Sequence, residues 1–335
     1  MKTFRKFPSI VQFAGVVKHV RDHCSYHNLP LPTLTFSGST KLHGTNSAVG
    51  FSPDGDIWFQ SRERLLSYES DNAGFCMWGE QNKDVLRDIY KTICEDQQLN
   101  HVAMYVYGEW FGQSIQKGVA LSQLTEKKFG IFEIIFVDEN DTTIRVDPVQ
   151  YHDLFNSSLS NVVVVDHVVP PYTIEIDFNN PSSVQNKLLE LTLAVEAECP
   201  VGKYFGISGI GEGICWTCDD DQVPLFKTKG EKHQSSKVTT VKELTSAEIA
   251  SKESALEFVE YACTENRLKQ GIAKLGEMGL SVDMKSMGEF LRWVGQDILK
   301  EEVDVLVKSN IERKHVMPRI ADKARNWFVN YINSL

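Results

Sequence analysis

The chain has 335 residues and a formal net charge of −10, with 42% hydrophobic and 24% charged residues. This composition is that of a folded globular protein long enough for about two domains, which excludes intrinsic disorder, collagen-like repeats and coiled-coil filaments. Because no stretch approaches the ~18 to 20 apolar residues of a membrane span, and no apolar core follows the basic N-terminus, we expect no membrane partner and no secretory signal.

The first predicted element is a surface helix over residues 9–27, with valines at its apolar positions and prolines at its exit. The region that follows contains short runs of β-branched and aromatic residues separated by turn signals, which predicts a domain dominated by sheet. The expected strands are residues 33–36, 48–51, 57–60, 101–110, 129–137 and 162–168, with helices inserted near residues 83–94 and 184–196.

Beyond residue 242 the apolar spacing becomes helical. Thr245 and Glu248 form a capping-box pattern, and Gly276 and Gly279 suit the end of a helix. We therefore predict an α+β fold with a sheet-containing domain over residues 1–240, a linker within residues 234–242, and an all-α domain over residues 241–335.

The sharpest chemical signal is the segment Lys41-Leu-His-Gly-Thr-Asn46, which lies between two predicted strands. A lysine amine is a poor nucleophile at its ordinary pKa of ~10.4, but it becomes competent when it is desolvated or lies among other cations. The glycine and small polar residues beside it would let a phosphate approach the backbone. Taken alone, the segment is explained slightly better by a surface lysine before a His-Gly turn.

Other polar residues at predicted strand ends favour a catalytic role for Lys41 over that of a surface lysine. Arg62 ends one strand, Glu109 lies at the end of another, and Glu212 begins a third. Lys227 and Lys229 lie on one face of a last strand, because strand side chains alternate with a period of two.

A lysine, an arginine, two carboxylates, an aromatic and a lysine pair in this order resemble the covalent nucleotidyltransferases, which are the polynucleotide ligases and mRNA capping enzymes. DNA ligases and capping enzymes usually carry aspartate at the position of His43. The spelling Lys-x-His-Gly-Thr-Asn is instead similar to the phage-type RNA ligase 2 family, which includes the kinetoplastid RNA-editing ligases. Residues 112–117, 266–267 and 296–299 are also similar to that family, so the resemblance covers nearly the whole chain.

The resemblance implies an antiparallel-sheet nucleotidyltransferase (ATP-grasp-like ligase) domain followed by a small all-α domain. It also implies an ATP-dependent reaction in which Lys41 attacks the α-phosphate of ATP and becomes a lysyl-adenylate. Lys227, Lys229 and a divalent metal would lower the pKa of the Lys41 amine, and the two lysines would stabilise charge on the phosphate. The metal is expected to be Mg²⁺, with Mn²⁺ as a substitute.

The remaining site residues take their roles from the same resemblance. Arg62 would bind phosphate or ribose, Glu109 would bind ribose or metal, and Glu212 would bind metal. Phe132 would stack on adenine, and His43 belongs to the site without an assigned step. In the helical domain, Arg267 and Asp297 would handle the RNA end.

The implied substrate is RNA with 3′-hydroxyl and 5′-phosphate ends, at nicks in a duplex, sealed by a monomer. Seven cysteines in so long a chain predict free thiols in a reducing compartment. Together these features suggest a virus-encoded enzyme acting in the host cytoplasm.

Three positions depart from the family pattern. Thr40 stands where the phage ligase has a glutamate that reads adenine, so the basis of selection for ATP stays open. Thr217 stands where members often have lysine, and Glu133 where aspartate is usual.

Two other classes of function were weighed. A DNA ligase or capping guanylyltransferase is disfavoured by His43 and by the helical tail, where those enzymes usually have an OB-fold. A non-catalytic nucleic-acid-binding protein would use the lysines of residues 227–242, but the net charge of −10 opposes such binding. His19, His23 and His27 could gather a metal at helical spacing, although a solvated helix face explains them better.

Overall fold

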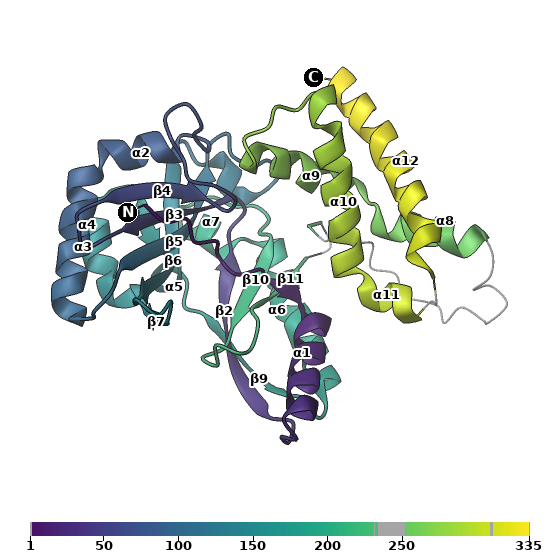
Figure 1. Ribbon diagram of the computed structural model, residues 1–335, viewed down its shortest axis with the longest axis horizontal. Coiled ribbons are helices and arrows are strands. Elements are labelled where there is room, and N and C mark those ends of the chain that lie inside the picture. Colours follow the sequence, from purple (N-terminus) through teal and green to yellow (C-terminus); the bar gives the residue numbers. More distant parts are fainter. Residues whose placement is uncertain (1, 231, 234–251, 309–310, 335) are drawn as a thin grey trace. The chain divides into compact units, whose positions relative to one another are not determined.

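The computed structural model describes residues 2–230, 232–233, 252–308 and 311–334, which fall into two compact units, Met1–Gly230 and Glu231–Leu335 (Figure 1). The boundary predicted near residue 240, the predicted linker and the Thr245 capping box lie outside the described residues. No helix among the described residues combines the length and apolar character needed to cross a bilayer.

The first unit contains two sheets. Neighbouring strands of the first sheet are antiparallel except for the parallel pair β1 and β11. Its longest strand ends on Lys41, five residues beyond the end of the predicted strand 33–36. The order of strands across this sheet is β1 (Val11–Gln12), β11 (Phe226–Lys229), β10 (Gly213–Thr217), β2 (Thr33–Lys41) and β9 (Tyr172–Asp177).

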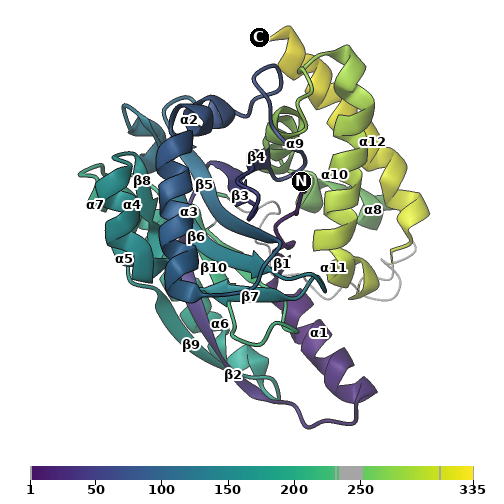
Figure 2. The same cartoon turned by 60° about the vertical axis from the view of Figure 1, so that its left-hand side comes forward.

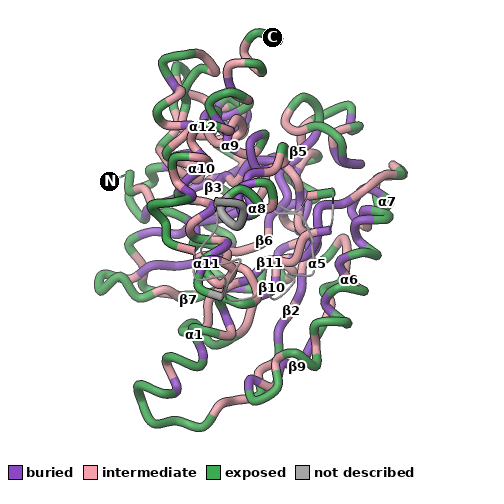
Figure 3. The backbone as a smooth tube through the Cα atoms, turned by 90° about the vertical axis from the view of Figure 1, so that its right-hand side faces the viewer, coloured by how far each residue is buried: buried purple, intermediate pink, exposed green. Residues whose placement is uncertain are grey.

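The second sheet is antiparallel along its main path, and one short strand, β8 (Val162–Val164), pairs in parallel with β6. Much of the chain along β3, β4 and β5 is buried, as the colouring of Figure 3 shows, because these strands are covered on both faces. The order of the main path is β4 (Ile57–Ser61), β3 (Thr45–Phe51), β5 (Ala103–Gly112), β6 (Lys127–Val137) and β7 (Thr143–Val146).

Helices pack against both sheets through apolar stripes. Ile89 and Ile93 of α3 enter the core of the second sheet, and α3 lies across β5 and β6 in Figure 2. Val16 of α1 and Val195 of α6 pack on Trp216 in the core of the first sheet. The helices of this unit are α1 (Phe13–Tyr26), α2 (Phe75–Gln81), α3 (Lys83–Gln97), α4 (His152–Ser158), α5 (Val165–Val168), α6 (Gln185–Ala197) and α7 (Pro200–Tyr204).

The predicted α+β fold class is confirmed, and most predicted strands of this unit are present. The strand predicted over residues 162–168 is wrong in its second half, because Val165–Val168 turns into α5. The predicted first helix starts later, at Phe13, because Val11–Gln12 pairs with β11. The sequence pattern did not indicate β7 and β9, which are short and partly exposed.

The second unit is helical over its described residues. Its core is formed by aromatic and aliphatic residues at helical spacing, including Phe290, Ile320 and Phe328. The prediction that Trp327 and Phe328 pack inside the helical domain is confirmed. The helices are α8 (Lys252–Ala262), α9 (Glu265–Glu277), α10 (Met287–Glu301), α11 (Val303–Lys308) and α12 (Arg313–Asn333).

A buried ion cluster links three of these helices. The Arg267 side chain is fully buried, and its guanidinium lies 2.8 Å from Asp297 and 2.8 Å from Glu302. It also donates to the carbonyl of Ala262, the last residue of α8. Arg267 therefore joins α9 to the end of α8 and to the end of α10, where both carboxylates lie.

Replacing Arg267 by Ala is expected to destabilise the protein by about 3 to 5 kcal/mol, because it leaves the buried Glu302 and the partly buried Asp297 without their cation. Urea unfolding of the full chain measures the change. The control is Lys269→Ala, which removes an exposed ion pair with Glu265 in the same helix and should leave the midpoint unchanged. Equal midpoints for the two variants would show that Arg267 is not part of a buried cluster.

Candidate active site

The strand register of the first sheet assembles the candidate nucleophile and one of the paired lysines. Lys41 at the end of β2 lies opposite Gly213 on β10, and Gly213 lies opposite Lys229 on β11. Gly213 has a φ of +150°, and a Cβ there would lie 2.0 Å from the carbonyl oxygen of Thr228, so this position requires glycine. Glu212 precedes β10 directly and is thereby placed between the two lysines.

One carboxylate holds this cluster together. The Glu212 side chain is 3% exposed; its Oε2 lies 2.8 Å from Lys41 Nζ and 3.0 Å from His43 Nδ1, and its Oε1 lies 3.0 Å from Lys229 Nζ. Burial alone would raise the pKa of Glu212, but the two lysines and the histidine outweigh it and hold the pKa well below its usual range. Glu212 is therefore an anion shared by Lys41, Lys229 and His43.

The pKa values of Lys41 and Lys229 are shifted in opposite directions. Burial would lower the pKa of Lys41, but the negative charge of Glu212 more than compensates, so the pKa lies above its ordinary value. The pKa of Lys229 is lowered by burial and by repulsion from Lys41 and Lys227, although Glu212 opposes the shift. The prediction that the neighbouring cations lower the pKa of Lys41 is wrong for this arrangement, because sequence alone did not show that Glu212 would contact the amine.

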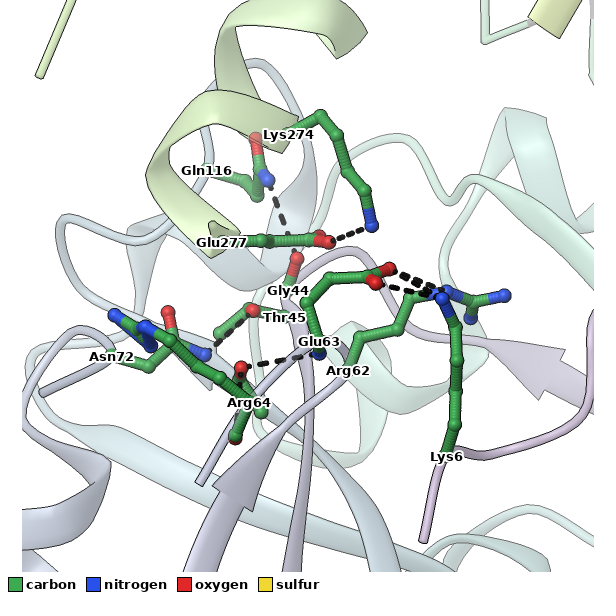
Figure 4. A network of polar contacts seen from close by, with 11 residues as sticks. Lys6, Gly44, Thr45, Arg62, Glu63, Arg64, Asn72, Gln116, Lys274 and Glu277 are labelled. Carbon is green, nitrogen blue, oxygen red and sulfur yellow. Dashed lines mark hydrogen bonds and ion pairs between the residues drawn. The ribbon is translucent and has the colours of Figure 1, made fainter. Parts of the chain in front are cut away.

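The loop after Lys41 is fixed from the second sheet as well. Glu109 on β5 accepts a hydrogen bond from the backbone N–H of Gly44 at 3.0 Å, and Gln116 donates to the carbonyl of Gly44 at 3.3 Å (Figure 4). Asn72 donates to the hydroxyl of Thr45 at 2.9 Å. The segment that crosses between the sheets is thus bound by Glu212 on one side and by Glu109 on the other.

Three other predicted residues of this unit lie outside these direct contacts. Lys227 shares a strand face with Lys229 and contributes to its lowered pKa. Arg62 follows β4, and its Nε lies 3.9 Å from Glu63, which also pairs with Lys6 (Figure 4). Phe132 lies at a bulge of β6, half-buried, with its ring 5.1 Å from that of Phe7.

Arg267 and Asp297 lie in the helical unit, where they contact each other inside the buried cluster described above. Arg267 has no exposed surface, so a direct contact with RNA requires this cluster to open. The rings of His19 and His23 in α1 are stacked, and the ring of His27, just after the helix, lies tilted 4.5 Å from that of His23. Within the described ranges, no group of three or more His, Cys, Asp or Glu side chains is arranged to hold a metal ion.

Sequence reasoning missed Asn72 as a residue that supports the loop. It named the segment of Gln116 as family-like without giving Gln116 a role. It also missed Ser39, although the two-residue period of a strand places Ser39 on the same face as Lys41. Ser39 donates to Asp166, for which no local pattern gave a signal.

The first unit thus combines two sheets with a lysine pair around one buried carboxylate, and a helical unit follows it in the chain. The family model for RNA ligase matches residues 35–239, and the chain belongs to the RNA ligase family.

Solved structures of a Naegleria gruberi RNA ligase are similar to this chain. The structure with pyrophosphate has 18% identity and a TM-score of 0.44, and the match covers 69% of this chain. A variant with ATP and manganese has 17% identity and a TM-score of 0.44, with the same coverage. In both cases the match spans 58% of the Naegleria chain. No curated protein matches this chain.

Replacing Gly44 by Ala is expected to destabilise the protein by about 1 to 3 kcal/mol, because a Cβ there would lie 2.3 Å from the carbonyl oxygen of Trp110. Thermal unfolding checks the change. Gly288→Ala is the control, since nothing lies within 4 Å of its Cβ position and its backbone is helical. A Gly44→Ala protein as stable as this control would show that the loop is not packed against β5.

Replacing Glu212 by Gln is expected to destabilise the protein by about 3 kcal/mol, because two buried ammonium groups lose their shared anion. Adding Lys229→Met to this variant should recover part of the loss, since one unpaired charge is removed. Chemical unfolding of the single and double variants measures the coupling. Glu198→Gln, which alters an exposed pair with Lys203, serves as the control; additive effects of Glu212 and Lys229 would contradict the shared ion cluster.

Proposed function

We propose that this protein is an ATP-dependent RNA ligase that joins 3′-hydroxyl and 5′-phosphate ends through a lysyl-AMP intermediate and an AMP-capped RNA. One observation carries the proposal: a partly buried lysine at the end of β2 shares a buried carboxylate with a second partly buried lysine two strands away. Membership of the RNA ligase family supports the reaction class. The Naegleria structures hold ATP, AMP or manganese, whereas the proposal for this chain rests on its own residues.

In the first step Lys41 Nζ forms a bond to the α-phosphorus of ATP, and the bond from that phosphorus to the bridging oxygen breaks, releasing pyrophosphate. The amine must be neutral to attack, so Lys41 first has to leave its ion pair with Glu212. Once that carboxylate is redirected, burial and the charge of Lys229 both favour the neutral amine. Lys227 and Lys229 then hold the phosphate oxygens as charge develops, and Arg62 binds phosphate or ribose.

The metal would be held by Glu109 and Glu212. The negative charges of both carboxylates raise the pKa of Lys41, so both lie near the Lys41 amine. Their oxygen atoms are suitable ligands for Mg²⁺ or Mn²⁺. A set of only two protein carboxylates fits Mg²⁺, which keeps several waters and binds substrate phosphates. When bound, the ion would neutralise phosphate charge.

In the later steps AMP passes from Lys41 to a 5′-phosphate, and a 3′-hydroxyl then displaces AMP to seal the strand. We propose nicks in duplex RNA as the substrate, with the helical domain handling the RNA end, and Phe132 as the base-stacking residue. The phage-type branch, a monomeric state and action in a host cytoplasm stay predictions of the sequence resemblance. Membership of the RNA ligase family counts against a DNA ligase or a capping guanylyltransferase.

The protein mixed with ATP and Mg²⁺ and then denatured is expected to gain the mass of one AMP on Lys41. Lys41→Ala should abolish both the adduct and strand sealing, because the attacking atom is gone. Lys229→Ala should slow adduct formation at least about tenfold, since a cation beside the phosphate is lost. Intact-protein mass spectrometry and a gel assay with nicked RNA and DNA duplexes measure the outcomes.

The matched control is Lys203→Ala, which removes an exposed lysine paired with Glu198 and should behave as the unmodified protein. A Lys41→Ala protein that still seals RNA would refute the mechanism, and sealing of DNA alone would favour the DNA ligase alternative.

A further inference from the structure

The structure separates Thr40 from the candidate nucleophile. Burial alternates along β2, with Phe36, Gly38 and Thr40 buried and the intervening residues less so. Phe36 belongs to the core of the first sheet, and a Cβ on Gly38 would meet the ring of Trp216. Thr40 therefore points into this core, whereas Ser39 and Lys41 share the opposite face. Selection of the base cannot come from the Thr40 side chain.

A partly buried carboxylate, that of Asp166, lies on the face of β2 that Lys41 occupies. Ser39 Oγ donates a hydrogen bond to Asp166 Oδ1 at 2.5 Å, and Ser39 is the only hydrogen-bond partner of Asp166 among the residues that the structure describes. Burial raises the pKa of Asp166 although the Ser39 bond opposes the shift. Because an ionised carboxylate can accept about four hydrogen bonds, Asp166 keeps unused acceptor capacity in a place with little water.

The same carboxylate borders the apolar region next to Lys41. Asp166 lies two residues beyond Val164, and Val164 is opposite Ile131 in the parallel pairing of β8 with β6, so Phe132 comes next on the neighbouring strand. Phe132 packs against the apolar cluster that contains Leu42 and Val165.

A Cβ on Gly130 would lie 2.5 Å from Leu42 and 3.3 Å from Val165, which shows how closely β6, α5 and the Lys41 loop approach each other. An aromatic ring, apolar side chains and a carboxylate thus lie on elements that meet near the loop after Lys41. This combination suits a flat heterocycle that carries an amino group.

We propose that Asp166, held in position by Ser39, selects adenine by accepting a hydrogen bond from its exocyclic amino group. A carboxylate only accepts hydrogen bonds, so it disfavours a base that presents a carbonyl oxygen at that position, as guanine and hypoxanthine do. The inference rests on the proposed function, in which Lys41 becomes linked to a nucleotide.

The experiment compares ATP with inosine triphosphate, in which a carbonyl replaces the amino group. The full chain is mixed with either nucleotide and Mg²⁺, and the rates of AMP and IMP addition are followed by intact mass. The unmodified protein is expected to prefer ATP. Asp166→Asn should lower this preference at least about tenfold, because its amide can donate to the carbonyl oxygen. Ser39→Ala should lower the preference by a smaller factor.

Asp147→Asn is the matched control, because it removes an exposed negative charge that acts on Asp166 without touching Ser39; its preference should be unchanged. An Asp166→Asn protein that forms the AMP adduct with the unmodified preference overturns the inference and leaves the ligase proposal intact. If circular dichroism shows that Asp166→Asn is unfolded, an unchanged preference in Ser39→Ala overturns it instead. An unmodified protein that forms no adduct with either nucleotide overturns both proposals.

Discussion

The structure of the site depends on one buried anion, Glu212, that two lysines share. Glu212 is almost fully enclosed, and two ammonium groups and an imidazole approach its two oxygen atoms. The carboxylate and the two ammonium groups are each costly to bury alone, so they are tolerated together and not separately. This mutual dependence fixes the end of β2, the start of β10 and the end of β11 relative to one another, and it explains why a reactive amine can be kept inside the protein without reacting.

The contact with Glu212 also determines the protonation state of Lys41. With Glu212 in contact, Lys41 stays protonated, although its buried position alone favours the neutral form. In the proposed reaction, Lys41 would therefore stay protonated and unreactive until Glu212 changes its partner. A charged group that arrives near Glu212 acts on the amine and on Lys229 at once, because both are bound to that carboxylate.

The sequence was informative where local pattern and chemistry coincide. Lys41, Glu212 and Lys229 were each visible as polar residues at strand ends, and their assembly follows from the pairing of β2, β10 and β11. Pattern could not show which carboxylate would contact which cation, and the pKa direction of Lys41 was therefore predicted wrongly. Asp166 is reached only through the parallel pairing of β8 with β6, a long-range contact that no local spacing encodes. The resemblance suggested Arg267 for handling the RNA end, and its burial could not be predicted because it depends on carboxylates 30 and 35 residues away in the chain.

The loop from Leu42 to Gly44 connects the two sheets at the site. One carboxylate from each sheet contacts it: Glu212 contacts His43, and Glu109 accepts a hydrogen bond from Gly44. A change in the angle between the two sheets would strain both of these contacts. It would also lengthen the contact between Glu212 and Lys41 that keeps the amine charged. Because Glu212 contacts the amine as well as His43, the geometry between the two sheets and the protonation of Lys41 are coupled. In the proposed reaction, the amine would still have to give up a proton before it attacks.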